Sequence, residues 1–355
     1  MIRLEHIIKK YGQTTAVNDL NLEIHSGEIC VLIGPSGCGK TTTLKMINRL
    51  IEPSSGKIMI DNRDSSSLKP FELRRGIGYA IQSVGLFPHL TVAENIAVVP
   101  KLLNWEKSRI EARVSELLEL IGLEPNRFAQ AYPKALSGGQ AQRVGVARAL
   151  AADPKVLLFD EPFGAVDPLT RERLQNEFLD LQKRLKKTVV FVTHDIDEAI
   201  KLADRIAILK DGKLEQFDTP EQILEQPANF FVRDFIGADR GLKRLARVFV
   251  RDVMRPSDSV KLEEQVKLRN SSVFVTDANG LLRGWLDGNA TGSSVRDAFS
   301  AYPWQDISVS ENANVREALS RMISLGFRVI PVVNDAGVLK GELALEQALG
   351  AKGSL

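Results

Sequence analysis

The stretch from Gly34 to Thr41 has the residue types and the spacing of a loop that binds phosphate groups. It reads Gly-Pro-Ser-Gly-Cys-Gly-Lys-Thr and matches G-x-x-x-x-G-K-S/T at every fixed position. In such a loop Lys40 reaches the β- and γ-phosphates of a nucleotide, and the Thr41 hydroxyl binds Mg²⁺. The alternative is a glycine-rich turn that precedes Lys-Thr by chance. The nucleotide-binding candidates of this segment are Gly34, Pro35, Ser36, Gly37, Cys38, Gly39, Lys40, Thr41 and Thr42.

Two further groups of polar residues follow apolar runs later in the chain. The run 156–159 precedes Asp160 and Glu161, and the run 188–193 precedes His194. Because the carboxyl ends of parallel strands meet at one edge of a sheet, these side chains are expected near the phosphate loop. Asp160 is then placed to hold Mg²⁺ through water, and Glu161 to act as general base on the attacking water. The alternatives are a solvated acidic turn and a histidine used in packing.

Three other segments have a role that the residues alone leave open. Tyr11 either stacks on a nucleotide base or packs at the edge of the domain. Gln82 follows the strand-like run 77–81, and its amide oxygen can ligate Mg²⁺ or orient a water. Ser137 is a predicted N-cap, and the helix terminus after it either binds an anion or is simply capped. The residues of this last candidate are Ser137, Gly138, Gly139 and Gln140.

The elements predicted around the loop are those that a phosphate site needs. The apolar run Ile29–Ile33 predicts a buried strand before the loop. After the loop, Leu44, Ile47 and Leu50 recur at helical spacing and predict a helix. Period-two alternation predicts strands over 2–7 and 20–24. The context of strand, loop and helix is therefore present.

A helical insert is predicted between the phosphate loop and the acidic strand. Thr91 and Glu94 form a capping box, and a second helix is expected over 111–120. Its apolar face consists of Val114, Leu117, Leu118 and Ile121. Farther along, Asp167 is expected to cap a helix that begins at Pro168, and Thr219 to cap another. Asp211-Gly212 predicts a hairpin turn.

Composition excludes several classes of protein. The chain of 355 residues is 44% hydrophobic and 26% charged, which is typical of a globular protein with two or three domains. We expect no membrane span and no secretory signal, so the chain should remain in the cytosol. The formal net charge of +2 indicates no nucleic-acid partner. Cys30 and Cys38 are expected to be reduced, and the four histidines show no zinc-ligand spacing.

In this order and spacing, the motifs of residues 1 to about 236 resemble the ATP-binding subunits of ABC transporters. The resemblance implies ATP and Mg²⁺ as ligands and an α/β fold. That fold is a P-loop NTPase domain of the ABC type, with a mixed sheet core, an antiparallel β edge and a helical subdomain at about 85–150. It also implies a homodimer, because each motif occurs once per chain and a complete site needs two chains. One departure is Val166, where leucine is usual.

The resemblance also implies a role for each candidate residue. Tyr11 stacks on adenine, Gln82 lies in the loop that links the nucleotide to the membrane subunit, and His194 is the switch histidine. Asp167 lies at the dimer contact, while Ser137 to Gln140 contact the γ-phosphate bound to the opposite subunit. Thr41, Gln82 and Asp160 are then the Mg²⁺ residues, and Glu161, His194 and Gln82 are the catalytic ones.

The last hundred residues contain a degenerate repeat. Two copies of strand, glycine turn and strand lie at 274–284 and 332–341, and an amphipathic helix precedes the second. The pattern resembles a pair of CBS modules at 251–355, joined to the first domain by a linker at 237–250. The stretch after Gly341 lacks the Thr/Ser and Asp that such pairs use for an adenine nucleotide, so a regulatory ligand and a purely dimerising role both stay open. Arginines at 240, 244, 247, 251 and 255 recur at helical spacing, either as a lipid-binding stripe or as a solvated connecting helix.

The segments at 82–89, 94–105 and 237–245, together with the CBS pair, resemble the osmoprotectant-uptake branch. This implies import of glycine betaine, choline, carnitine or a related quaternary amine. The implied partners are integral permease subunits and, indirectly, an extracytoplasmic substrate-binding protein, with the chain on the cytoplasmic face of the membrane. Two alternatives are an importer ATPase for an amino acid or a sugar, and a soluble ABC ATPase of translation or repair.

Overall fold

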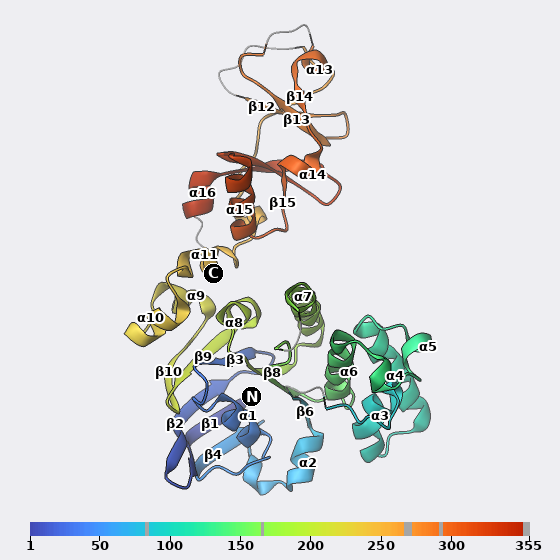
Figure 1. Cartoon of the computed structure of the whole chain (residues 1–355), viewed down its shortest axis with the longest axis vertical. Coiled ribbons are helices and arrows are strands. Elements are labelled where there is room, and N and C mark those ends of the chain that lie inside the picture. The colour runs from blue at the N-terminus through green and yellow to red at the C-terminus, as the bar shows by residue number, and fades with distance from the viewer. Residues whose placement is uncertain (82–84, 165–166, 266–271, 291–293, 351–355) are drawn as a thin grey trace. The chain divides into compact units, whose positions relative to one another are not determined.

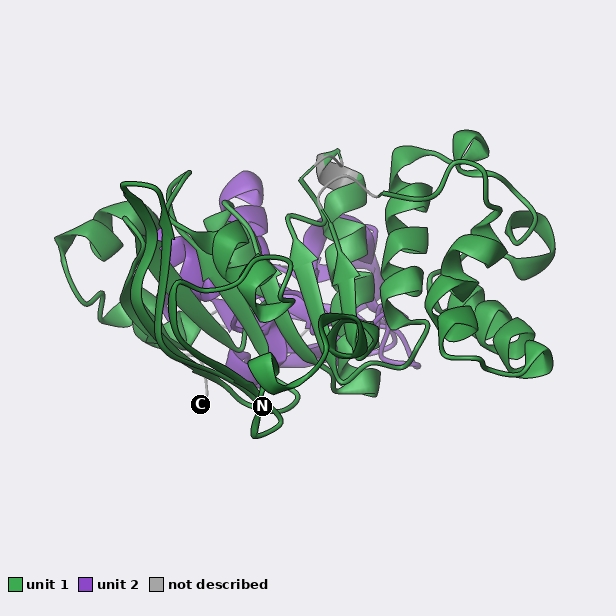
Figure 2. Ribbon diagram, turned by 90° about the horizontal axis from the view of Figure 1, so that it is seen from below, with its two compact units in different colours: residues 1–236 green, residues 237–355 purple. Residues whose placement is uncertain are grey.

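A computed structural model of the chain describes residues 1–81, 85–164, 167–265, 272–290 and 294–350. It divides into two compact units, Met1–Ile236 and Gly237–Leu355, which Figure 2 shows in different colours. In the described residues no helix is long and apolar enough to cross a membrane.

The centre of the first unit is a six-stranded sheet in the order β10-β9-β3-β8-β7-β6. Its strands are β3 (Ile29–Ile33), β6 (Ile77–Ala80), β7 (Val156–Asp160), β8 (Thr188–Val192), β9 (Arg205–Lys210) and β10 (Lys213–Asp218). All neighbouring pairs are parallel except β9 with β10, whose hairpin turns at Asp211 and Gly212 as predicted. Every residue of β3, β7 and β8 is buried, which explains their uninterrupted apolar runs.

A second sheet of the first unit is antiparallel, in the order β2-β1-β4-β5. Its strands are β1 (Ile2–Tyr11), β2 (Thr14–Ile24), β4 (Ser55–Ile60) and β5 (Arg63–Asp64). Ile2, Leu4 and Ile7 of β1 are buried in one core with residues of β3 and α1 (Lys40–Ile47), and a register shift lies between Leu4 and Ile7. The strands predicted over 2–7 and 20–24 are confirmed, and both extend farther than predicted.

Helices of the first unit flank the central sheet (Figure 1). They are α1 (Lys40–Ile47), α2 (Pro70–Arg75), α3 (Val92–Leu102), α4 (Lys107–Leu120), α5 (Pro125–Phe128), α6 (Gly138–Leu150), α7 (Pro168–Leu185), α8 (Ile196–Leu202), α9 (Pro220–Glu225) and α10 (Phe230–Ile236). The caps predicted at Thr91, Ser137, Asp167 and Thr219 are confirmed. The expectation for Leu50 was wrong, because α1 ends before it and its side chain is 45% exposed.

The second unit repeats one supersecondary pattern. In each copy a short parallel strand, β11 (Ser259–Lys261) or β15 (Val309–Ser310), pairs with the first strand of an antiparallel hairpin. The hairpins are β12 (Val273–Thr276) with β13 (Leu282–Leu286), and β16 (Val329–Val333) with β17 (Leu339–Ala344). The remaining elements are α11 (Arg240–Leu245), α12 (Val250–Val253), α13 (Val295–Ala298), β14 (Ser300–Ala301), α14 (Trp304–Ile307), α15 (Val315–Leu325) and α16 (Leu345–Gly350).

The two hairpin turns of the second unit are equivalent. Asp277 accepts hydrogen bonds from the backbone NH groups of Asn279 and Leu281, and Asn334 accepts the matching pair from Ala336 and Val338. The turns also bond to each other, from Leu282 N to Gly337 O and from Leu339 N to Gly280 O, both at 3.0 Å. The predicted repeat is therefore present as a pair of hairpins related by an approximate twofold axis.

The basic stripe expected from Arg240 to Arg255 does not lie on one helix. The segment forms two short helices, α11 and α12, and Arg255 lies beyond both, in a bridge with Glu342. Backbone hydrogen bonds from Val250 N to Ala313 O and from Arg251 N to Glu311 O hold the segment against the second copy. Because of these tertiary hydrogen bonds, the segment does not form one continuous helix despite the helical spacing of its arginines.

Candidate nucleotide site

The phosphate loop leads from β3 into α1 and closes around a lysine. Lys40 is 7% exposed, and its ammonium group donates to the carbonyl oxygens of Gly34 at 2.7 Å and Pro35 at 3.0 Å. The Cys38 sulfur lies 3.7 Å from the same nitrogen. Because the carbonyl groups point at Lys40, the ammonium can exchange these partners for phosphate oxygens.

Two glycines of the loop are required by close backbone contacts. Gly34 has φ +149°, and a Cβ there would lie 2.1 Å from Leu209 O of β9. Gly39 has φ +101°, and a Cβ there would lie 2.5 Å from Ala16 O of β2. Gly37, in contrast, has nothing within 4 Å of a built Cβ. The loop is therefore packed against β9 and β2 and is open at Gly37, as a cradle for phosphate groups requires.

Asp160, the last residue of β7, lies beside the first turn of α1. The Thr41 hydroxyl donates to its carboxylate at 3.0 Å, and Asp160 is 7% exposed. Burial raises the pKa of the Asp160 carboxyl, the Thr41 hydrogen bond opposes this, and the charge of Glu161 adds to it. A hydroxyl and a carboxylate side by side are oxygen ligands of the kind Mg²⁺ takes, so these residues fit the ion. Among the described residues no cluster of three His, Cys, Asp or Glu ligands occurs.

Glu161 and His194 meet where β7 and β8 end. The parallel register pairs Asp160 with Val192, and Glu161 N donates to Val192 O at 2.9 Å. The His194 Nδ1 atom lies 3.3 Å from Glu161 Oε2. Glu161 has φ +48°, a left-handed conformation that is uncommon for a residue with a side chain. The sheet thus places the predicted base and the predicted switch histidine in contact at the edge that carries Gly34.

Tyr11 ends β1 beside the phosphate loop. Its hairpin partner strand touches Gly39 through Ala16, and the Tyr11 side chain is half exposed. The Lys9 ammonium lies 5.0 Å from the ring centroid. An exposed ring at this end of the hairpin is accessible to a base, whereas the alternative of a tyrosine packed at the domain edge would bury it.

The segment predicted to contact a nucleotide bound to the opposite subunit begins at Ser137. Its hydroxyl accepts from Gln140 N at 3.3 Å, and Ser137 N donates to Gln140 Oε1 at 2.9 Å, which forms a capping box. Ser137 and Gly138 are exposed, and no described residue beyond the neighbouring helix backbone lies within 4 Å of a Cβ built on Gly138. Asp167 is also exposed, and it caps α7 by accepting from Thr170 N. Among the described residues, no hydrogen bond joins the four-residue segment to the phosphate loop of its own chain.

Gln82 lies outside the described residues, as do Ala165 and Val166. The segment that follows it is fixed by a residue that the sequence reading missed. Asn95, fully buried, accepts from Phe87 N at 2.8 Å and donates to the carbonyl oxygens of Phe87, Leu90 and Thr91. An amide between the buried residues Val92 and Ile96 of an apolar helix face was the available signal. Asn95 thus joins the segment after Gln82 to α3.

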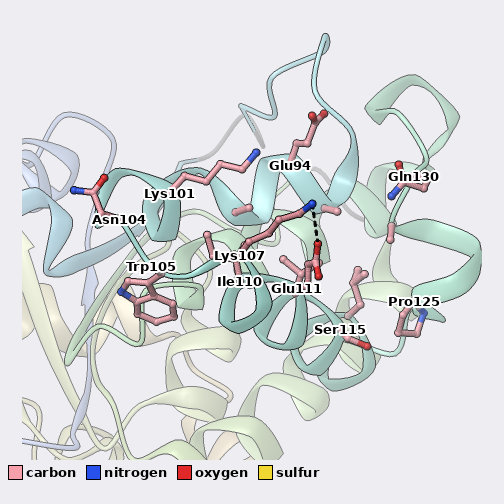
Figure 3. Close-up of a pocket in the computed structure, with 15 residues that line it drawn as sticks. Glu94, Lys101, Asn104, Trp105, Lys107, Ile110, Glu111, Ser115, Pro125 and Gln130 are labelled. Carbon is pink, nitrogen blue, oxygen red and sulfur yellow. Dashed lines mark ion pairs between the residues drawn. The ribbon is translucent and has the colours of Figure 1, made fainter.

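Two cavities flank α3. One, of about 790 Å³, lies between α3 and α4 with Ala97, Ile110 and Val114 in its lining and the ion pair of Lys107 with Glu111 at 3.8 Å (Figure 3). The other, of about 330 Å³, is lined by Gly85 and Phe87, and by residues of β6, α3 and α6. Only the second includes residues of the segment that follows Gln82 among its described lining.

A parallel sheet that presents a glycine-rich phosphate loop, a buried aspartate beside its threonine and a glutamate–histidine pair defines a P-loop nucleoside triphosphatase. The family model for ABC transporters matches residues 17–164, and that for the CBS domain matches residues 295–351. The dimeric structure of MJ0796, a bacterial ABC transporter cassette, is 39% identical, with a TM-score of 0.56 over 62% of this chain and 98% of its own.

Three curated relatives extend the similarity over both units. The carnitine transport ATP-binding protein OpuCA of Listeria monocytogenes is 47% identical over 96% of this chain and 89% of its own length. The osmoprotectant import ATP-binding protein OsmV of Salmonella typhimurium is 45% identical over 97% and 94%. The glycine betaine uptake system ATP-binding protein YehX of Escherichia coli is 45% identical over 98% and 99%.

This chain belongs to the family of ABC transporter ATP-binding subunits, in the branch that serves osmoprotectant uptake. It is an ATPase coupled to transport and binds ATP and ADP. Cassettes of this family dimerise and work with membrane permease components.

Proposed function

We propose that this chain hydrolyses ATP with Mg²⁺ to drive import of a quaternary-amine osmoprotectant such as glycine betaine, choline or carnitine. The observation that carries the solute class is the similarity of both units to relatives named for these solutes. The first unit alone does not distinguish importers of different solutes. A spermidine/putrescine import ATP-binding protein, PotA of Chromobacterium violaceum, is 44% identical over 72% of the chain.

In the proposed mechanism the described residues divide the work. Lys40 and the open loop at Gly37 bind the phosphates, and Tyr11 provides a ring for the base. Thr41 and Asp160 hold Mg²⁺, which when bound neutralises developing charge on the phosphates. Glu161 accepts the proton of the attacking water, and His194, in contact with Glu161, orients it.

A second copy of the chain completes the site in this proposal. Ser137 to Gln140 form an exposed helix N-terminus with free space at Gly138, which suits contact with a γ-phosphate held by another chain. Asp167 is exposed on α7 and is proposed to lie at the same dimer contact. Hydrolysis would then depend on closure of the dimer.

The permease is proposed to dock on the cytoplasmic face of the membrane at the 330 Å³ cavity. Phe87, in its lining, is 42% exposed. Asn48, also in the lining, is 3% exposed and has an Oδ1 atom with no partner among the described residues. A buried acceptor of this kind favours a donor from outside the chain. Because Asn95 joins Phe87 to α3, a permease segment there would contact the element that follows Gln82.

The proposal is tested by transport. The chain is reconstituted in vesicles with its permease subunits and binding protein. Uptake of labelled glycine betaine, choline, carnitine, amino acids and sugars is then followed with ATP inside. We expect saturable uptake of quaternary amines that disappears in a Glu161→Gln chain. Uptake of an amino acid or a sugar without quaternary amines would refute the proposed solute class.

A further inference from the structure

The second unit contains a cavity of about 660 Å³ where its two hairpin copies meet. Phe274 and Trp285 come from β12 and β13 of the first copy, and Phe327, Arg328 and Glu342 come from the second. Arg255 and Asp258, from the segment before β11, complete the charged part of its lining. All these residues belong to one compact unit.

Three aromatic rings form one side of this cavity. The Trp285 and Phe327 rings have centroids 4.8 Å apart at an interplanar angle of 77°, and the Phe274 ring lies 6.5 Å from Trp285. Phe274 is buried, whereas Trp285 and Phe327 are partly exposed. In this edge-to-face pair the edge of one ring covers part of the other, but both residues line the cavity. Aromatic faces attract a quaternary ammonium, which is more weakly hydrated than a primary ammonium.

The formal charges of the side chains in the described lining sum to zero. Arg255 donates to Glu342 Oε1 at 2.8 Å, and their backbones are bonded in both directions, so this pair is fixed. The Arg328 and Asp258 side chains are exposed and make no hydrogen bond or ion pair with the described residues. Two carboxylates disfavour a polyanion, and two guanidinium groups disfavour a simple cation.

We propose that this cavity binds a small zwitterion that carries a quaternary ammonium and a carboxylate, with the ammonium against Trp285 and Phe327 and the carboxylate on Arg328. The aromatic corner suits a methylated ammonium, and a free guanidinium suits a carboxylate. The choice of glycine betaine as the probe rests on the proposed function, because that compound has both groups. The chain that drives import thus carries a site for the imported class of solute.

The experiment uses the full chain with Trp105 and Trp304 replaced by Phe, so that Trp285 is the remaining one of its three tryptophans. Its fluorescence is titrated with glycine betaine, choline and glycine at equal osmolality. We expect a saturable change with glycine betaine and none with glycine, which has the carboxylate but no methyl groups. Phe327→Ala is expected to weaken glycine betaine and choline about tenfold each.

Arg328→Gln separates the two halves of the ligand. It should weaken glycine betaine about tenfold and leave choline, which has no carboxylate, unchanged. Lys340→Gln removes the same charge from an exposed residue outside the cavity lining and should leave both affinities unchanged. Arg328 is exposed, so this test stands even if the Phe327 variant does not fold.

Three outcomes would overturn the inference: a linear response shared with glycine, an unchanged glycine betaine affinity in Arg328→Gln, or a response to AMP in place of glycine betaine. The vesicle experiment tests the proposed function independently of this cavity. If vesicles import glycine betaine while the chain does not bind it, the cavity assignment alone is wrong. If the chain binds it while vesicles import another solute, the proposed function alone is wrong.

Discussion

Two neighbouring carboxylates at the end of β7 lie in different environments. Asp160 is buried and bonded to the Thr41 hydroxyl, whereas Glu161 turns away through a left-handed backbone and contacts His194. Burial and the Glu161 charge raise the pKa of Asp160, which the coordinating ion would lower again by favouring the charged form. Adjacent acids in a sequence can therefore take separate roles, as ligand and as base.

Glu161→Gln tests the base directly. The amide keeps the size of the side chain but cannot accept a proton, so ATP hydrolysis should fall by about 10² to 10⁴. The affinity for ATP should stay within about twofold, because Lys40 and the loop are unchanged. Glu172→Gln, an exposed change on α7, is the matched control for hydrolysis and nucleotide binding. Wild-type turnover in the Glu161 variant would remove Glu161 from the role.

Asp160→Asn tests how much the buried, ionised carboxylate lowers the stability of the fold in the absence of Mg²⁺. Since the pKa of Asp160 is raised in the folded chain, its ionised form opposes folding at neutral pH, and the opposition fades as pH falls through the folded pKa. The Asn variant should therefore have the higher melting temperature at pH 7, with a gap that shrinks toward acid pH, while its hydrolysis is lost. Calorimetry across pH measures this, with exposed Asp180→Asn as control. A gap that widens toward acid pH would contradict the argument.

The contacts among Thr41, Asp160, Glu161 and His194 could be expected from sequence, because buried parallel strands bring their carboxyl ends together. The clamp made by Asn95 could not, since one asparagine in a helical pattern does not reveal four hydrogen bonds to a preceding loop. The position of Lys40 on two carbonyl groups of its own loop was equally hidden, because the motif describes its bound partner only.

At the level of elements, the N-terminus of α6 is the proposed contact with a second chain. The methyl group of Gly138→Ala meets no atom within 4 Å among the described residues beyond the neighbouring helix backbone, so folding and single-chain ATP binding should be unchanged. If another chain's phosphate lies against this terminus, the added methyl group should reduce hydrolysis about tenfold or more. Circular dichroism and steady-state hydrolysis at several protein concentrations measure both effects. Gly241→Ala, also in open space, is the control. Equal loss in both variants would argue against the proposed contact.

The segment after Gln82 gives a second test at this level. Phe87 is exposed and lines the 330 Å³ cavity, so Phe87→Ala should weaken the affinity for the permease about tenfold. ATP affinity should not change, because the ring lies outside the phosphate loop. Pull-down from detergent with tagged permease and equilibrium nucleotide binding separate the two. Phe71→Ala, a change to another exposed ring, on α2, is the control, and equal binding by both variants would place the permease elsewhere.

Two elements show where local pattern was insufficient. The helical spacing through Leu50 failed because Arg49 adopts φ +47° and ends the turn after Ile47. The arginines after Gly237 kept a helical period, but Phe249 pairs with Asn314 and the chain extends from Met254 onward. The spacing of residues within a segment cannot predict that its backbone will pair with residues sixty or more positions away.

For the whole molecule, the two units have separate hydrophobic cores. The two core clusters of the first unit involve residues from Ile2 to Ile236, and the three of the second involve residues from Leu245 to Ala348. The repeat in the second unit was visible in sequence because each turn has an Asp or Asn with a Gly three residues later, Asp277 with Gly280 and Asn334 with Gly337. The joining of those turns to each other was not visible, since it depends on backbone bonds between the copies.

Separate cores predict separate unfolding, and the ATP site lies in one of them. In calorimetry of the full Glu161→Gln chain, which holds ATP without consuming it, we expect two transitions. ATP with Mg²⁺ at a hundredfold excess over Kd stabilises only the unit that binds it, by about 2.7 kcal/mol. For a unit of this size that raises its melting temperature by about 5 to 10 °C, and the other transition should stay in place. The wild-type chain with ADP is the control and should show a smaller shift of the same transition. A single transition, or a shift of both by equal amounts, would mean that the two cores unfold as one.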